Sequence, residues 1–175
     1  MYFLDSNVFI EASNRYYSFD ICPGFWDWLD REIPNGKVAS IVNVYEELKE
    51  CKDELANWVK IRRNQGMFLD VDDTATQEAF QKIAATVGQS AYKPSAKSQF
   101  LAGADPWLIA KALAQKGTVV THEQPAPDSI KRVPIPNICQ EYGIDFINTF
   151  DLLRKSSVTF ELPTINKPPP RPRRR

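Results

Sequence analysis

The 175-residue sequence has few residues that could form disulfides or imidazole metal sites. Its three cysteines, Cys22, Cys51 and Cys139, are an odd number, lie far apart and include no CxxC pair. This spacing argues against a disulfide framework and against a zinc ribbon, and it is typical of proteins from a reducing cytosol. The single histidine, His122, excludes a metal site built from several imidazoles.

Long apolar runs are also missing. None approaches the roughly 20 residues that are needed to span a bilayer. The chain does not begin with the basic stretch and apolar core of a signal peptide. We therefore expect a cytoplasmic protein that has no membrane partner.

The charges balance over the whole chain but are unevenly distributed. Residues 167–175, KPPPRPRRR, carry five basic side chains, which leaves a net charge of −5 on residues 1–166. A chain of this length suits one domain with a well-filled core. Proline prevents regular structure at its end, and nothing apolar there would repay ordering. We expect a single domain over residues 1–162 and a flexible Pro/Arg-rich tail over residues 163–175.

Short apolar segments alternate with longer segments of helical period. Strands are predicted at 2–4, 38–40, 67–71, 118–121 and 144–147, and helices at 22–33, 43–63, 72–88, 105–116 and 148–155. Residues 88–100 resemble a loop or a broken helix, and residues 125–139 an irregular proline-rich connection. This alternation predicts an α/β domain with a parallel sheet of about five short strands and helices on both faces.

An acidic residue interrupts the apolar start of the chain, MYFLDSNVFI. Burying an unpaired carboxylate there would cost several kcal/mol, on the order of the stability of a small domain. Asp5 must therefore stand at the tip of the strand or have a partner. In parallel sheets, ligands bind beyond the carboxyl ends of the strands.

Two further acids lie at such positions. Glu123 comes two residues after the TVVT strand, and Asp105 begins the helix DPWLIAKAL. Each also has a purely structural explanation. Asp105 before Pro106 is a good helix N-cap, and Glu123 fits a solvated loop acid. What favours a site is that these acids and Asp5 all fall where a parallel sheet gathers its ligands.

A fourth acid must be chosen between Glu46 and Glu47. At about 100° per residue, Glu47 lies on the flank of the apolar stripe that begins at Val44, whereas Glu46 faces solvent. Asn43 and Glu46 also nearly match a capping box, which would use Glu46 at the helix start. We therefore expect Glu47 to be the half-buried acid that needs a counter-charge.

Four carboxylates that converge without basic partners repel one another. We see no lysine or arginine in the four segments that is placed to neutralise them. A divalent cation would do so, and hard oxygen ligands favour Mg²⁺ or Mn²⁺. Asn7 and Thr121 are expected to be hydrogen-bonding neighbours of the ligands.

Four segments resemble the acidic motifs of PIN domains, in the same order and at similar spacing: FLDSNVFI, VYEELK, ADPWLIAKAL and VVTHE. The resemblance covers roughly residues 1–150. It implies the compact three-layer α/β fold of those nucleases. It also implies a Mg²⁺- or Mn²⁺-dependent ribonuclease, often the toxin of a VapC-like toxin–antitoxin pair. VVTHE together with the downstream IPNIC is similar to a less-studied PIN subfamily.

By motif, the resemblance assigns Asp5, Glu47 and Asp105 as the first three metal ligands and catalytic acids. Glu123 stands where the aspartate of the family's TxD pattern usually sits, one methylene longer. The resemblance further implies RNA as the substrate, a protein antitoxin as partner and a homodimer as assembly.

Residues outside these motifs are candidates for RNA contact. Arg15, Tyr16 and Tyr17 are suited to contact phosphate and stack on bases, although the tyrosines also fit packing against the first predicted helix. Lys93 and Lys97 are weaker alternatives.

Other functions stay open from sequence. A non-catalytic acidic binding module would use these acids only to cap helices, and a PIN nuclease need not be a toxin because it can process housekeeping RNA. A magnesium-dependent phosphatase or a receiver-like domain usually needs an acidic pair at the first strand, which LDSN lacks.

Overall fold

Five short strands form one parallel sheet in the computed structural model, which describes residues 1–51 and 53–161. The strand order is β3-β2-β1-β4-β5, so the first strand of the chain is the central one. The strands are β1 (Tyr2–Leu4), β2 (Val38–Ile41), β3 (Phe68–Leu69), β4 (Thr118–Val120) and β5 (Phe146–Ile147). The predicted all-parallel sheet is confirmed.

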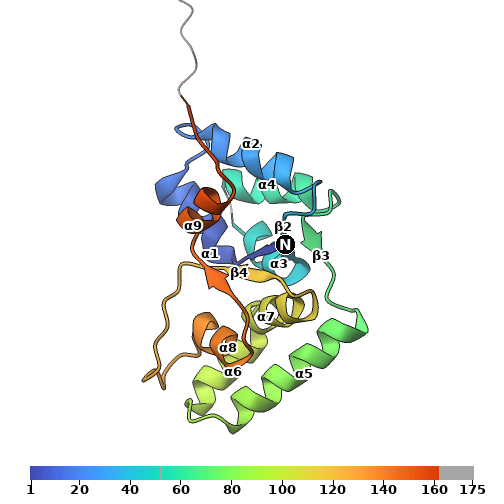
Figure 1. Cartoon of the computed structure of the whole chain (residues 1–175), viewed down its shortest axis with the longest axis vertical. Coiled ribbons are helices and arrows are strands. Elements are labelled where there is room, and N and C mark those ends of the chain that lie inside the picture. The colour runs from blue at the N-terminus through green and yellow to red at the C-terminus, as the bar shows by residue number, and fades with distance from the viewer. Residues whose placement is uncertain (52, 162–175) are drawn as a thin grey trace, which may run out of the picture.

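Helices cover both faces of this sheet (Figure 1). The first half of the chain contributes α1 (Ser6–Glu11), a π-helical turn η1 (Ala12–Tyr16), α2 (Pro23–Glu32), α3 (Val42–Lys49) and α4 (Glu54–Arg62). The second half contributes α5 (Thr74–Gln89), α6 (Pro94–Ala102), α7 (Asp105–Ala114), α8 (Ile135–Glu141) and α9 (Thr149–Lys155). Figure 1 shows α2 and α4 on one side of the sheet and α5 to α8 on the other. In the described part of the chain, no helix is long and apolar enough to cross a membrane.

The apolar run at the N-terminus divides into a strand and a helix at Asp5. Phe3 and Leu4 are fully buried in β1, and Val8 and Phe9 are fully buried on α1. The helical segment 6–16 was not predicted, because Val8 and Phe9 after the interruption at Asp5 have the same apolar, strand-like character as residues 2–4. Asp5 is the residue at which the backbone leaves the sheet.

A close approach at Gly117 fixes the entry to β4. A Cβ atom at this position would stand 2.4 Å from the ring of Phe3 on the central strand, so only glycine fits there. The predicted end of the preceding helix at Gly117 agrees with α7, which ends at Ala114. This contact brings the residues that follow β4 beside those that follow β1.

The helix predicted over 43–63 is in fact two helices, α3 and α4. The apolar spacing runs through Leu48, Cys51 and Leu55 without interruption, so periodicity alone hides the break. Asp53 marks it locally, because its carboxylate accepts a hydrogen bond from the backbone N–H of Ala56 (3.0 Å) and caps α4.

Three other predictions need correction. Residues 94–102, expected to be a loop or broken helix, form α6, which begins at Pro94 as its first residue. The proline-rich connection over 125–139 is irregular only at first, because α8 begins at Ile135. The strand predicted at 67–71 is only Phe68–Leu69. The predicted tail over 163–175 and the domain boundary at 162 lie outside the described residues.

Candidate active site

Asp5 lies at the carboxyl end of the central strand. Its backbone N–H donates to the carbonyl of Val120 on β4 (3.0 Å), and its side chain is only 1% exposed. The carboxylate accepts hydrogen bonds from Thr121 Oγ1 (3.0 Å) and Asn7 Nδ2 (3.4 Å). Burial raises the pKa of Asp5, and the hydrogen bonds from Thr121 and Asn7 offset only part of this rise. The contacts expected of Asn7 and Thr121 are therefore present.

Glu47 points from α3 toward the same region. Its carboxylate accepts a hydrogen bond from Ser6 Oγ (2.6 Å) and another from the backbone N–H of Ala104 (3.1 Å). These bonds link α3 to the start of α1 and to the residue before α7. Glu46 faces away, with 58% of its side chain exposed, and forms an ion pair with Lys49. The face that the sequence assigned to each glutamate agrees with the structure.

The capping box expected at Asn43 and Glu46 is wrong. Helix α3 begins at Val42, directly after β2, and the residue in the cap position is Ile41. No side chain caps this helix, because Asn43 already lies within the first turn. Glu46 is exposed because of its helical face and not because it caps the helix.

Asp105 lies in the first turn of α7 and is half-buried. Burial raises its pKa to about 7, the negative charges of Asp5 and Glu47 add to this rise, and Arg132 opposes it. The N-cap role considered for Asp105 is wrong, because Ala104 occupies the cap position and Asp105 is the first helical residue. The structure thus brings three of the predicted acids, Asp5, Glu47 and Asp105, within electrostatic reach of one another.

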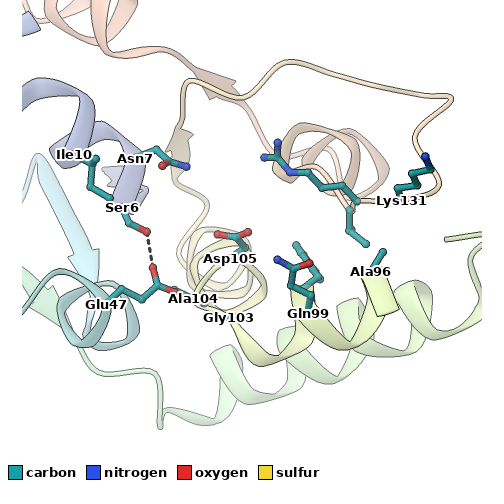
Figure 2. A pocket seen from close by; sticks show the side chains of 13 residues that line it. Ser6, Asn7, Ile10, Glu47, Ala96, Gln99, Gly103, Ala104, Asp105 and Lys131 are labelled. Atoms are coloured by element: carbon teal, nitrogen blue, oxygen red, sulfur yellow. Dashed lines mark hydrogen bonds between the residues drawn. The ribbon is translucent and has the colours of Figure 1, made fainter. Parts of the chain in front are cut away.

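A cavity of about 520 Å³ is lined by Glu47 and Asp105, and by Asn7, whose amide donates to the buried Asp5. Figure 2 shows Glu47 and Asp105 on one side, Gln99 of α6 beside them, and Lys131 across the cavity with its amine turned away from Asp105. Arg132 also lines the cavity. We refer to it as the acid cavity. Its lining combines two carboxylates, Glu47 and Asp105, with two basic residues, Lys131 and Arg132, a combination that suits an anionic ligand held near a cation.

Glu123 is placed differently from the other three acids. Its carboxylate accepts a hydrogen bond from the backbone N–H of Ile135 (2.8 Å) and forms an ion pair with Arg132. It lines a neighbouring depression, not the acid cavity. The expectation concerned only basic residues within the four motifs, and Glu123 has a basic partner from outside them, because Arg132 lies in the connection after the last motif.

The three converging acids suit a hard divalent cation in charge and ligand type. Burial raises the pKa of Asp105, and the charges of Asp5 and Glu47 raise it further, so a positive charge among these acids would be favourable. Over residues 1–51 and 53–161, however, no three acidic, histidine or cysteine side chains stand close enough to hold an ion in their present rotamers. A bound ion would require these side chains to turn toward one another.

Comparison with known proteins places the chain in a family. Residues 2–160 match the family described as Domain of unknown function (DUF4411). The chain belongs to the DUF4411 family. No curated protein sequence matches it significantly.

Two solved structures resemble the DUF4411 domain in fold. The crystal structure of FitAcB from Neisseria gonorrhoeae matches with a TM-score of 0.50 and 17% identity, over 86% of this chain and 99% of that chain. VapBC2 from Rickettsia felis, bound to a DNA fragment from their promoter, matches with a TM-score of 0.49 and 17% identity, over 84% of this chain and 97% of that chain. The fold is PIN-like, as the sequence motifs predicted.

The loop that connects β4 and α8 in the DUF4411 domain is anchored by hydrogen bonds of Asn137. Asn137 accepts a hydrogen bond from the backbone N–H of Ala126 (2.9 Å) and donates to its carbonyl (2.8 Å) and to Tyr92 Oη (3.1 Å). The loop therefore presents Arg132 to the site from an anchored backbone. Sequence reasoning missed Lys131 and Arg132; two adjacent basic residues shortly after the fourth motif were the available signal.

The three residues proposed for RNA contact have different surroundings. Arg15 is 67% exposed in its side chain and pairs with Glu11 (3.2 Å). Tyr16 is 47% exposed. Tyr17 stacks on Phe25 of α2, with ring centroids 4.5 Å apart. Packing therefore accounts for Tyr17, while Arg15 and Tyr16 reach the surface.

Neither of the weaker lysine candidates lines the acid cavity. Lys97 donates hydrogen bonds to the carbonyls of Gly88 (2.8 Å) and Ser90 (2.6 Å), so it closes the end of α5. Lys93 occupies the cap position of α6. Lys97 thus has a structural explanation in the DUF4411 domain.

Proposed function

We propose that this chain is a metal-dependent endoribonuclease of the cytoplasm. The observation that supports it is the convergence of Asp5, Glu47 and Asp105, from three distant segments, at the carboxyl end of the sheet. Glu47 and Asp105 line one cavity there, and Asp5 is buried within electrostatic reach of Asp105. Burial is the main reason for the raised pKa of Asp105, and the charges of Asp5 and Glu47 add to it more than Arg132 offsets, so a cation would be favoured among these acids. A site that keeps unfavourable charge is typical of function rather than of folding stability.

The proposed ligands are Asp5, Glu47 and Asp105 for Mg²⁺ or Mn²⁺, with Glu123 as the fourth acid. When bound, such an ion supplies an activated water and stabilises negative charge that develops on phosphate oxygens. The chain itself orients the acids: Thr121 and Asn7 hold Asp5, and Ser6 and the N–H of Ala104 hold Glu47.

Lys131 and Arg132 are the residues that we propose position the anionic substrate. A phosphodiester that approaches the carboxylates is repelled unless positive charge also stands at the cavity. These two side chains line the cavity, and Arg132 is close enough to lower the pKa of Asp105 by its charge. We propose that they contact the substrate backbone and set its distance from the acids.

The biological role that we propose is the toxin of a toxin–antitoxin pair, with a protein antitoxin as partner and a homodimer as assembly. This part of the proposal depends on the sequence motifs that resemble VapC-like PIN domains. Processing of a housekeeping RNA uses the same chemistry and is the alternative that the growth experiment below separates.

The test of the chemistry is cleavage of single-stranded RNA by the purified full chain. We expect cleavage with Mg²⁺ or Mn²⁺, none with excess chelator, and none by Asp5→Asn, which keeps the size of the side chain and removes its charge. The variant should be folded, and in the absence of metal at least as stable as wild type, because one repelling charge is gone. Cleavage that persists in Asp5→Asn or in chelator would overturn the proposal.

The test of the toxin role is expression without a partner. Wild-type protein should stop growth, and Asp5→Asn should be tolerated. If both proteins are harmless while the wild type cleaves RNA in vitro, the toxin role is wrong and the nuclease stands.

A further inference from the structure

A second depression, of about 390 Å³, adjoins the acid cavity. Asn7 and Arg132 line both, so the two hollows meet across these side chains. The size of the second depression is within the range of small-ligand sites. We refer to it as the aromatic depression, because Tyr16 and His122 form part of its wall.

Tyr16, which is exposed, and His122, which is half-buried, form a supported pair of rings. Their centroids are 5.9 Å apart, and Phe150 packs edge-on against both, at 5.2 Å from Tyr16 and 6.0 Å from His122. A hydrogen bond between His122 Nε2 and Thr149 Oγ1 (3.0 Å) fixes the imidazole. Rings that are held in place and open to solvent are suited to stacking with a planar ligand, because little conformational entropy is lost on binding.

The charges around the aromatic depression cancel, in contrast to the acid cavity. Arg15 pairs with Glu11, and Arg132 pairs with Glu123. An anionic ligand is therefore not repelled here. The guanidinium of Arg132 has five N–H donors, so it can contact a phosphate at the boundary of the two hollows while it keeps Glu123 as a partner.

From these observations we infer that the aromatic depression binds one nucleotide of a single-stranded RNA. The base next to the cleaved bond stacks on Tyr16 and His122, and its phosphate contacts Arg132. The inference rests on the proposed function for its substrate and adds a requirement to it. A base that stacks on protein side chains cannot stay paired, so the substrate must be single-stranded at this position.

The test is binding of a labelled six-nucleotide single-stranded RNA to the full chain in excess chelator, where cleavage does not interfere. We expect Tyr16→Ala to weaken binding about tenfold, within the range of one base–aromatic stack, and Tyr16→Phe to stay within about twofold of wild type. Phe160→Ala is the matched control, because this aromatic residue is also exposed but lines a different hollow. It should bind like wild type.

A series of the same RNA with one abasic nucleotide at each position locates the contact. Wild type should lose about tenfold in affinity at one position, and Tyr16→Ala should lose nothing further there, since the stack is already gone. Increasing salt separates the two kinds of contact. Arg132→Gln should lower the salt slope by about one, whereas Tyr16→Ala should leave the slope unchanged.

Three results would overturn the inference: Tyr16→Ala binding like wild type, additive losses at every abasic position, or no binding of RNA by the wild type. A folded-state check by thermal unfolding and the Tyr16→Phe variant separate a lost contact from a misfolded protein. If the coupling at one position is found but Mg²⁺ and Mn²⁺ produce no cleavage, the nuclease proposal fails and the subsite stands.

Discussion

Helix α7 carries two charged residues whose surroundings are opposite. Lys111 is 6% exposed, and its amine donates hydrogen bonds to Asp73 Oδ2 (2.6 Å) and to the carbonyl of Asp70 (2.8 Å). Asp105, less than two turns earlier, is half-buried beside two further acids, Asp5 and Glu47. The lysine lowers the pKa of Asp73, whereas the acids help to raise that of Asp105.

The difference separates a charge that serves folding from one that does not. A buried lysine with a carboxylate and a carbonyl as acceptors adds to stability, because its desolvation is offset by charge-assisted hydrogen bonds. Three acids near one another reduce stability until something positive joins them. On helix α7, therefore, the charge of Lys111 is neutralised in the interior of the fold. Asp105, which lines the acid cavity, has acidic neighbours instead.

Removing the uncompensated charge should have the largest effect on activity. Asp105→Asn should lower metal-dependent RNA cleavage by about 100-fold or more, since even residues that only orient metal ligands cost 10–100-fold. The thermal midpoint without metal should stay or rise, because a repelling charge is lost. Cleavage assays and thermal unfolding of the same preparation check both expectations. A loss of activity together with a fall in stability would indicate that Asp105 serves the fold instead.

The two adjacent glutamates provide a matched pair on α3. Glu47→Gln should lower cleavage by at least about tenfold, because Glu47 points to the acid cavity and is held by Ser6 and Ala104. Glu46→Gln should leave cleavage unchanged, and the loss of its exposed pair with Lys49 should cost at most about 1 kcal/mol. Equal loss in both variants would contradict the assignment of faces.

Removing the charge of Lys111 should lower stability and leave activity unchanged, which is the reverse of the pattern expected for Asp105. Lys111→Met keeps the length and apolar stem of the side chain but loses two hydrogen bonds, so the free energy of unfolding should fall by about 1–2 kcal/mol. Cleavage per folded molecule should be unchanged. Chemical denaturation and a cleavage assay on the folded fraction are the measurements, and a large loss of turnover would break the comparison.

The last expected effect involves no change in activity and concerns the pH dependence of stability without metal. The pKa of Asp105 is raised to about 7 in the folded protein, so the folded state binds more protons than the unfolded state between about pH 4 and 7. Stability should therefore fall as pH rises through this window. Mg²⁺ should restore it above pH 7 by mass action.

Two variants separate the contributions to this pH profile. Asp105→Asn should flatten the fall between pH 4 and 7 in metal-free thermal unfolding. The lowered pKa of Asp73 acts with the opposite sign, because it stabilises above the ordinary aspartate pKa and is lost as pH falls below it. Lys111→Met should therefore reduce the loss of stability at acid pH and leave the Asp105 window unchanged.

The sequence was sufficient to predict the parallel sheet and to predict that Asp5, Glu47 and Asp105 lie near one another. Asp5 and Asp105 follow or precede elements whose ends must meet in a parallel sheet, and the helical angle distinguished Glu47 from Glu46. That these acids bind metal stays a prediction. The local sequence pattern gives the position of a residue on its own helix or strand. The order of the strands in the parallel sheet then determines which of these residues lie near one another.

Partners that come from irregular segments were beyond the reach of such patterns. Arg132 lies in a loop without periodicity, and its contact with Glu123 depends on how Asn137 holds that loop. The pairing of Lys111 with Asp73 joins two helices that are remote in sequence. Neither contact has a local signature, since each is set by packing across the domain.

The central position of β1 sets the order in which a ribosome could complete this site. Asp5 is made before Thr121, whose hydroxyl donates to its carboxylate, and 116 residues separate the two. At about 5–20 residues per second, roughly 6 to 23 seconds pass between the synthesis of the two. The N-terminal strand has no neighbour on its β4 side during that time, and the acid cavity has no Arg132. A site built in this order cannot be complete until both Thr121 and Arg132 have been made.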